Sequence, residues 1–260
     1  MKKKISVALS VIALCSLCLI VNVGTAMAGT GGNITEYFSQ NALTIDGKWT
    51  TADEWHDTTT QRISPNAVFE YKLMFEAEYM MNWLVEFADK TNDAGDRWQI
   101  CVDGSNDGGA APNANDLKFE IEGHTTLKQY VGTGTGWGAP TTATGVTWKD
   151  SLVTSSPHDP ATHYVLEFQL IKTQYDWGAN PPPNGLRIAM YDASNPSQGW
   201  VSWPTTSTDP NPAGWGSIAD YSMEAAPEGL TIGLMLAVSS VAVVVSARYF
   251  RKQPKIKSYN

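Results

Sequence analysis

Large apolar residues alternate with polar ones in several short stretches in the middle of the chain. The alternation is clearest in 81–87, where every odd position is apolar: Met81, Trp83, Val85 and Phe87. A period of two turns one side of a strand toward the core and the other side away from it. The same reasoning predicts further strands at 68–75, 97–103, 116–122, 164–170 and 186–190.

Segments rich in Gly, Pro, Asn and Thr separate these predicted strands. They occupy 103–115, 131–140, 180–185 and 194–199. Such segments are typical of turns and loops. No long stretch shows a helical period of 3.6 residues before position 230, and no internal repeat is visible. Many short strands with Gly/Pro-rich connections predict an all-β domain, an antiparallel β-sandwich.

The first 28 residues form a predicted secretory signal peptide. Lys2, Lys3 and Lys4 precede a long apolar run, and the segment ends with the small-residue pattern AMA at 26–28. A basic start, an apolar middle and small residues before the cut are typical of signal peptides. We expect cleavage before Gly29, with an uncleaved anchor helix as the alternative.

A second apolar stretch predicts a transmembrane helix at 230–247. Its 18 residues carry no charge, and at about 1.5 Å per residue they reach about 27 Å, close to the thickness of a bilayer core. The basic tail at 248–260 marks the cytoplasmic side. The predicted protein is therefore anchored in the cell membrane by one span, with a β-sandwich at 29–223 outside the cell and a linker at 224–229.

The end of the chain also resembles the C-terminal sorting signals of archaeal surface proteins, of the PGF-CTERM and PEF-CTERM type. The resemblance rests on Pro227-Glu228-Gly229-Leu230, the apolar helix and the basic cluster that follows. It implies that a sorting enzyme removes the helix and that a lipid replaces it. Permanent anchoring by 230–247 is the simpler expectation.

Charge and cysteine content narrow the possible functions of the predicted ectodomain. Of the 18 basic residues of the chain, 10 lie in 29–227, together with 25 of the 26 acidic ones. A net charge near −15 argues against a nucleic-acid partner, which requires a basic face. Cys101 is the only cysteine after position 28, so no intramolecular disulfide forms there and the fold depends on its hydrophobic core.

The order of motifs resembles the family 9 carbohydrate-binding modules and the related DOMON-like domains. The resemblance runs from about 43 to 219 and includes Ile45-Asp46-Gly47, Asp53-Glu54-Trp55 and the D-x-x-x-I-x-V-D stretch at 96–103. It continues with 164–170, 185–192 and Trp200-Val-Ser-Trp203-Pro204, and ends with Gly214-Trp215-Gly216-Ser217-Ile218. This resemblance implies a β-sandwich appended, in its relatives, to xylan- and cellulose-degrading enzymes. It also implies an extracellular glycan or polysaccharide as partner and a place in carbohydrate catabolism.

Tryptophans outside the predicted strands are the candidates for stacking on sugar rings. In family 9 modules the two sugar-holding tryptophans lie in loops that correspond to 91–95 and 207–213, where this sequence has no aromatic residue. Aromatic faces pack on apolar sugar faces while hydroxyl groups bond nearby, and binding residues concentrate on loops. Trp137, Trp177 and Trp200 are therefore the expected carbohydrate-binding residues, with anchoring of loops against the sandwich as the alternative.

Two groups of aspartates predict structural calcium. Asp103, Ser105 and Asp107 alternate and are followed by Gly108, as in the first half of a calcium loop. The twelfth position is Ala114, so this loop is no EF-hand, and we expect Asp116 from the next strand to complete the site. The second group comprises Asp89, Asp93 and Asp96. The alternative for both is an acidic loop in which Asp and Gly serve turn geometry.

Two other functions compete with carbohydrate binding. Some DOMON relatives are haem-binding electron-transfer domains whose ligands are Met and His, or Met and Lys. The candidate ligands for haem are Met74, Met80, Met81, Met190, His56, His124, His158 and His163. The other competitor is a structural cell-envelope protein without a small ligand. No nucleophile motif, zinc motif or phosphate loop is present, so we expect a protein that is not an enzyme.

Overall fold

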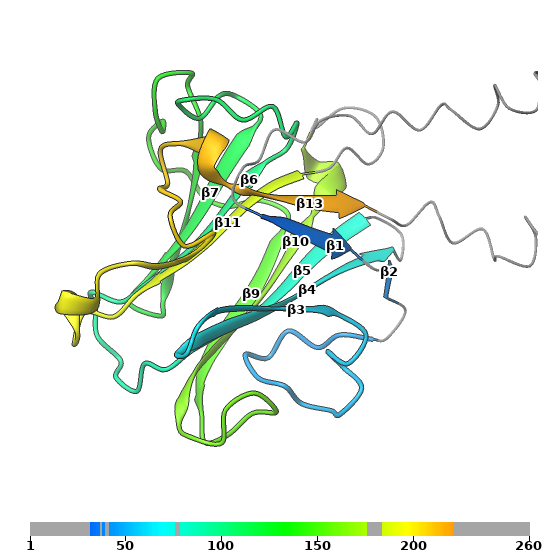
Figure 1. Cartoon of the computed structure of the whole chain (residues 1–260), viewed down its shortest axis with the longest axis vertical. Coiled ribbons are helices and arrows are strands. Elements are labelled where there is room, and N and C mark those ends of the chain that lie inside the picture. The colour runs from blue at the N-terminus through cyan, green and yellow to red at the C-terminus, as the bar shows by residue number, and fades with distance from the viewer. Residues whose placement is uncertain (1–31, 37, 40–41, 76–78, 176–183, 221–260) are drawn as a thin grey trace, which may run out of the picture.

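The chain folds into two β-sheets that face each other. The computed structural model describes residues 32–36, 38–39, 42–75, 79–175 and 184–220, and the sheets belong to these residues. The first, here named the β6 sheet, has strand order β1-β13-β11-β6-β7-β8, with β12 beside β11; the second, the β5 sheet, has the order β2-β4-β5-β10-β9, with β3 beside β4 (Figure 1).

The strands and short helices have the following bounds. The β6 sheet contains β1 Asn33–Glu36, β6 Arg97–Asp103, β7 Asp116–Glu122, β8 Thr126–Val131, β11 Asn184–Tyr191, β12 Val201–Trp203 and β13 Gly216–Asp220. The β5 sheet contains β2 Phe38–Ser39, β3 Thr59–Ser64, β4 Ala67–Phe75, β5 Tyr79–Phe87, β9 Val146–Val153 and β10 His163–Ile171. Three 3-10 turns lie at Lys172–Gln174, Pro196–Gln198 and Pro212–Gly214.

The apolar residues of the predicted strands meet between the two sheets. The odd positions of β5 and the even positions of β10 belong to one continuous core with the even positions of β6 and β11. Trp83, Phe168 and Phe119 illustrate this packing, because the Phe168 ring lies 5.9 Å from Trp83 and 5.3 Å from Phe119. The predicted all-β class and the sandwich arrangement are confirmed.

The centre of the β5 sheet is buried on both faces, which the alternating pattern did not predict. On the face of β5 that points away from the core, Leu84 and Glu86 are 0% and 2% exposed. Trp55 and its neighbours in the segment before β3 pack against Leu84 and Val165. Glu167 anchors this segment, since its carboxylate accepts hydrogen bonds from Trp55 Nε1 at 2.9 Å and from the Gly47 amide at 2.8 Å.

Two strand pairs depart from the antiparallel arrangement. Strand β1 runs parallel to β13, with Asn33 opposite Ser217, and β2 runs parallel to β4, with Phe38 opposite Leu73. Both pairs join strands far apart in the sequence and include a short strand from the start of the domain. The sandwich is therefore mainly, but not wholly, antiparallel.

Several predicted segments lie outside the described residues. These are the signal peptide at 1–28, the linker at 224–229, the helix at 230–247 and the tail at 248–260. Within the part of the chain that the structure describes, no helix is long and apolar enough to cross a membrane.

Candidate functional site

Three aspartates meet where the β6–β7 connection begins and ends. Antiparallel pairing places Asp103, the last residue of β6, opposite Asp116, the first residue of β7. Asp107 lies in the loop between them. One carboxylate oxygen from each residue lies within 4.8 Å of the others. We name this group the β6–β7 carboxylate cluster, and it unites the aspartates that the sequence suggested for one calcium site.

The loop holds two of these carboxylates through main-chain donors. Asp103 Oδ2 accepts a hydrogen bond from the Gly108 amide at 2.8 Å, and its Oδ1 accepts one from the Ser105 amide at 3.1 Å. Asp116 Oδ2 accepts one from the Asn113 amide at 2.7 Å. The Ser105 hydroxyl lies 3.3 Å from Asp103 Oδ1, so the structure places this predicted ligand as a donor that steadies Asp103.

One oxygen of the β6–β7 carboxylate cluster is left without a partner. Asp116 is fully buried, and its Oδ1 accepts no hydrogen bond among the described residues. Burial, followed by the nearby charges of Asp103 and Asp107, raises the pKa of Asp116 to about 7. A buried acceptor without a donor is costly, and a cation with oxygen ligands satisfies both the acceptor and the charge. The residues present therefore fit a divalent cation such as Ca²⁺.

A second group of acidic residues lies at the opposite end of β6. Asp93 and Asp96 precede this strand, and Asp192 follows β11, which pairs with β6 so that Tyr191 faces Arg97. Their carboxylate oxygens lie within 4.8 Å of one another, and we name them the β6–β11 carboxylate cluster. Asp192 is a member that the sequence analysis missed, because only the strand pairing brings it to Asp96.

The predicted site residue Asp89 joins this region through a histidine. Asp89, Asp96 and His124 form a separate close group that shares Asp96 with the β6–β11 carboxylate cluster. His124 Nε2 lies 3.1 Å from Asp96 Oδ2, and its Nδ1 lies 2.6 Å from Asp150 Oδ2. Burial alone lowers the pKa of His124, but the two carboxylates leave it raised. Because both partners are carboxylates, the charged imidazolium, which donates from both nitrogens, is the form that fits.

The two clusters therefore differ in how their negative charge is balanced. The β6–β11 carboxylate cluster has the His124 imidazolium beside it, and Asp96 Oδ1 accepts a hydrogen bond from the Ala193 amide at 2.8 Å. The β6–β7 carboxylate cluster has an unpartnered buried oxygen instead. Charge balance favours the β6–β7 carboxylate cluster as the place for a cation. Metal binding by Asp89, Asp93 and Asp96 stays a prediction.

A hollow of about 230 Å³ opens on the outer face of the β6 sheet beside Trp200. It is lined by Gln99, Arg187, Trp200, Ser207, Thr208 and Asp209. The Trp200 side chain is 43% exposed, and the Tyr191 ring lies 5.5 Å from it. Arg187 Nη1 donates to Gln99 Oε1 at 2.8 Å, which fixes the guanidinium in the floor of the hollow. An exposed aromatic ring beside fixed polar groups is suited to a sugar ring and its hydroxyl groups.

The predicted sugar-binding residue Trp137 lies close to this hollow but is half-buried. Its ring stacks on that of the buried Trp215, with centroids 6.2 Å apart and an interplanar angle of 11°. The ammonium group of Lys118 lies 5.2 Å from the Trp137 ring and 3.0 Å from Asp209 Oδ2, which lines the hollow. Packing against Trp215 thus explains part of the Trp137 surface. The third candidate, Trp177, lies outside the described residues.

The methionines and histidines suggested for haem lie in varied surroundings. Met74, Met81 and Met190 are buried in strands, Met80 is partly buried and His56 is exposed. His158 Nε2 lies 2.6 Å from Glu70 Oε1, and His163 Nε2 lies 3.3 Å from Glu86 Oε2. Among the described residues, no methionine lines the hollow beside Trp200 or a second one beside His163. Haem binding stays a prediction.

Comparison with known proteins identifies the fold. No protein-family model and no curated protein matches the chain. The chain is similar to a solved carbohydrate-binding module of family 9 (CBM9) from Caldicellulosiruptor kristjanssonii in complex with glucose, with 16% identity and a TM-score of 0.51 over 73% of this chain and 96% of that one. A CBM9 structure from the same organism in complex with cellotriose gives 17% identity and a TM-score of 0.49 over 73% and 94% of the two chains.

The likeness to the glucose complex concerns the fold alone, because so few residues are identical. It confirms the predicted family 9-like β-sandwich. The relation to DOMON-like domains and to the archaeal sorting signals stays a prediction.

Proposed function

We propose that this protein is a membrane-anchored cell-surface protein that binds carbohydrate without a catalytic role. The observation that carries the proposal is the hollow beside Trp200, where an exposed indole ring adjoins the buried Arg187 and Gln99. The similar CBM9 structures hold glucose and cellotriose, which supports a sugar as the ligand class. In this site Trp200 packs on the apolar face of a sugar ring, and Arg187, Gln99 and Asp209 bind its hydroxyl groups.

Calorimetric titration of the full chain with glucose and cello-oligosaccharides tests this proposal. We expect Trp200→Ala to weaken binding about tenfold or more, because the variant removes the stacking surface. Trp137→Ala and Trp177→Ala test the other two predicted residues in the same assay. Leu152→Ala is the matched control, since Leu152 is 46% exposed and lies on β9 of the other sheet. Binding that is lost equally in Leu152→Ala, or unchanged in Trp200→Ala, would contradict the proposed site.

We further propose structural Ca²⁺ at the β6–β7 carboxylate cluster. The ion is held by Asp103, Asp107 and Asp116, and it balances the negative charge that is buried there. Carboxylate and carbonyl oxygens are the ligands that Ca²⁺ prefers. Binding of the ion would hold the two ends of the β6–β7 loop together. The middle of this loop contacts the segment before Trp215, because the Ala213 amide donates a hydrogen bond to Gly109 O at 2.9 Å.

The proposed location is the cell surface, with the sandwich outside and the C-terminus inside. The proposal rests on the apolar segment 230–247 and the basic tail after it. Protease digestion of intact cells that express the protein tests the orientation. We expect loss of an epitope placed after residue 32 and protection of one placed after residue 257, and the reverse result would contradict the orientation.

A further inference from the structure

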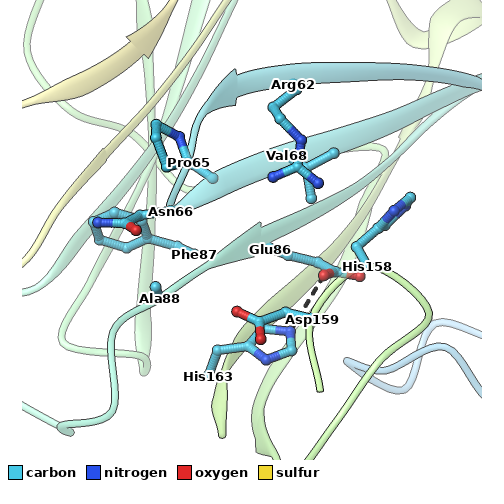
Figure 2. Close-up of a pocket in the computed structure, with 11 residues that line it drawn as sticks. Arg62, Pro65, Asn66, Val68, Glu86, Phe87, Ala88, His158, Asp159 and His163 are labelled. Atoms are coloured by element: carbon cyan, nitrogen blue, oxygen red, sulfur yellow. Dashed lines mark ion pairs between the residues drawn. The ribbon is translucent and has the colours of Figure 1, made fainter. Parts of the chain in front are cut away.

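A second hollow, of about 200 Å³, lies on the outer face of the β5 sheet, on the opposite side of the sandwich from Trp200. The β3–β4 turn, the end of β5 and the loop between β9 and β10 surround it. Figure 2 shows the Glu86 side chain reaching toward His163 from β5, with Asp159 beside them. The proposed carbohydrate and calcium sites use none of these residues.

The imidazole of His163 is oriented by the main chain. The residue is 1% exposed, and its Nδ1 lies 2.7 Å from the carbonyl oxygen of Ala161. A carbonyl oxygen only accepts hydrogen bonds, so Nδ1 carries the hydrogen and the neutral ring keeps its lone pair on Nε2. Nε2 lies 3.3 Å from Glu86 Oε2; burial lowers the pKa of His163, but this carboxylate leaves it raised. A histidine whose Nδ1–H is held by a carbonyl and whose Nε2 shares a proton with a carboxylate has the arrangement of a metal ligand once an ion replaces that proton.

Glu86 supplies a buried carboxylate that faces His163 and has one oxygen without a partner among the described residues. The residue is 2% exposed; its Oε2 accepts a hydrogen bond from the Ser156 hydroxyl at 2.7 Å, and its Oε1 has no partner among the described residues. Glu86 Oε2 lies 3.3 Å from His163 Nε2, the contact drawn dashed in Figure 2. Two ligands bound tetrahedrally to zinc at about 2.0–2.1 Å stand roughly 3.3–3.4 Å apart. The pair therefore already has the separation of two zinc ligands.

We propose that this hollow binds a divalent transition metal of the Zn²⁺ class through His163 Nε2 and the Glu86 carboxylate. Asp159 lines the same hollow as a second carboxylate, and water completes the coordination. A mixed nitrogen and oxygen ligand set suits Zn²⁺, whereas Ca²⁺ takes oxygen ligands. His158 Nε2 bonds Glu70 at 2.6 Å instead and holds the β9–β10 loop against the sheet. The metal would tie this loop to β5.

Zinc titration of the metal-free full chain, in competition with a chromogenic chelator, tests the proposal. We expect one equivalent of Zn²⁺ to bind at this site, and we expect His163→Gln and Glu86→Gln each to lower its affinity at least about tenfold. His56→Gln is the matched control because His56 is exposed and does not line the hollow. Asp116→Asn separates the two metal proposals, since it should leave zinc affinity unchanged. No zinc binding, or equal zinc affinity in wild type and both His163→Gln and Glu86→Gln, would overturn the proposal.

A measurement on the unsubstituted protein avoids any dependence on how the variants fold. The ring nitrogens of the histidines are followed by NMR during addition of Zn²⁺. We expect the Nε2 resonance of His163 to shift while its Nδ1 stays protonated. A shift confined to His56, His124 or His158 would place the ion elsewhere and reject the site.

Discussion

The β6–β7 carboxylate cluster predicts an unusual response to removal of one negative charge. In Asp116→Asn the side chain keeps its shape and an oxygen for the Asn113 amide, but it no longer repels Asp103 and Asp107. Without calcium, we expect the variant to be more stable than the wild type at pH 7.5. With calcium, we expect the wild type to be more stable than the variant, because the variant has lost a ligand of the ion.

The magnitude follows from the pKa of Asp116. Its value rises from 3.8 to about 7 on folding, and one pKa unit corresponds to about 1.36 kcal/mol, so the upper limit is about 4 kcal/mol. Asp107 is exposed and solvent screens its charge, which reduces the expected gain to about 1–3 kcal/mol. For a domain of this size that gain raises Tm by about 2–10 °C.

The pH dependence has a definite sign. A carboxyl group whose pKa is higher in the folded state favours folding fully below its unfolded pKa, and that advantage is lost as pH rises through the folded value. In a chelator, the wild type should therefore lose stability between about pH 4 and pH 7 relative to Asp116→Asn. Calcium at about 1,000 times its Kd should restore about 4.1 kcal/mol to the wild type alone, which exceeds the advantage of the variant.

Thermal unfolding of the full chain in detergent, followed by tryptophan fluorescence, measures these differences. Samples contain either calcium or a chelator, and the pH is varied in the chelator series. Asp53→Asn, an exposed position before β3, controls for the loss of one negative charge. An unchanged or lower Tm of Asp116→Asn in the chelator, or an equal rise in Tm with calcium in the variant and the wild type, would contradict this prediction.

Three further substitutions probe the structure. Asp192→Asn should preserve the calcium-induced rise in Tm, because His124 already balances the negative charge of the β6–β11 carboxylate cluster. If calcium no longer raised the Tm of this variant, a second ion would have to bind at that cluster. Glu167→Gln should lower the free energy of unfolding by about 1–3 kcal/mol in a denaturant titration. The Glu167 carboxylate accepts hydrogen bonds from Trp55 Nε1 and from two main-chain amides, and the NH₂ group of glutamine cannot accept any. An unchanged midpoint would show that this anchor is dispensable. Gly47→Ala should lower Tm by several degrees, because Gly47 has φ +81° and an added Cβ would lie 2.8 Å from the Asp150 carbonyl carbon; a wild-type Tm would show that the loop shifts freely.

The sequence predicted the core faces of the central strands because burial there follows a period of two. Met81 and Leu170 pair across β5 and β10 and both point inward, as the alternation indicated. The meeting of Asp103 with Asp116 was also predictable, because a hairpin returns the chain to its own start. These successes share one property: residues close in sequence determine them.

The features that the sequence did not predict depend on contacts between distant segments. Asp192 reaches Asp96 only through the register of β11 on β6. Burial of Leu84 depends on the segment around Trp55, which lies between β2 and β3 and packs on the outer face of the β5 sheet. The direction in which His163 Nε2 faces Glu86 follows from the contact of Nδ1 with the Ala161 carbonyl, which no residue type specifies.

The parallel pairing of β1 with β13 determines how the domain would respond to mechanical force. The four pairs from Asn33 opposite Ser217 to Glu36 opposite Asp220 run in the same direction. Tension between the two ends of the domain pulls β1 and β13 lengthwise in opposite directions, so their hydrogen bonds are loaded together in shear rather than broken one after another. This pairing therefore acts as a mechanical clamp between the two ends of the domain.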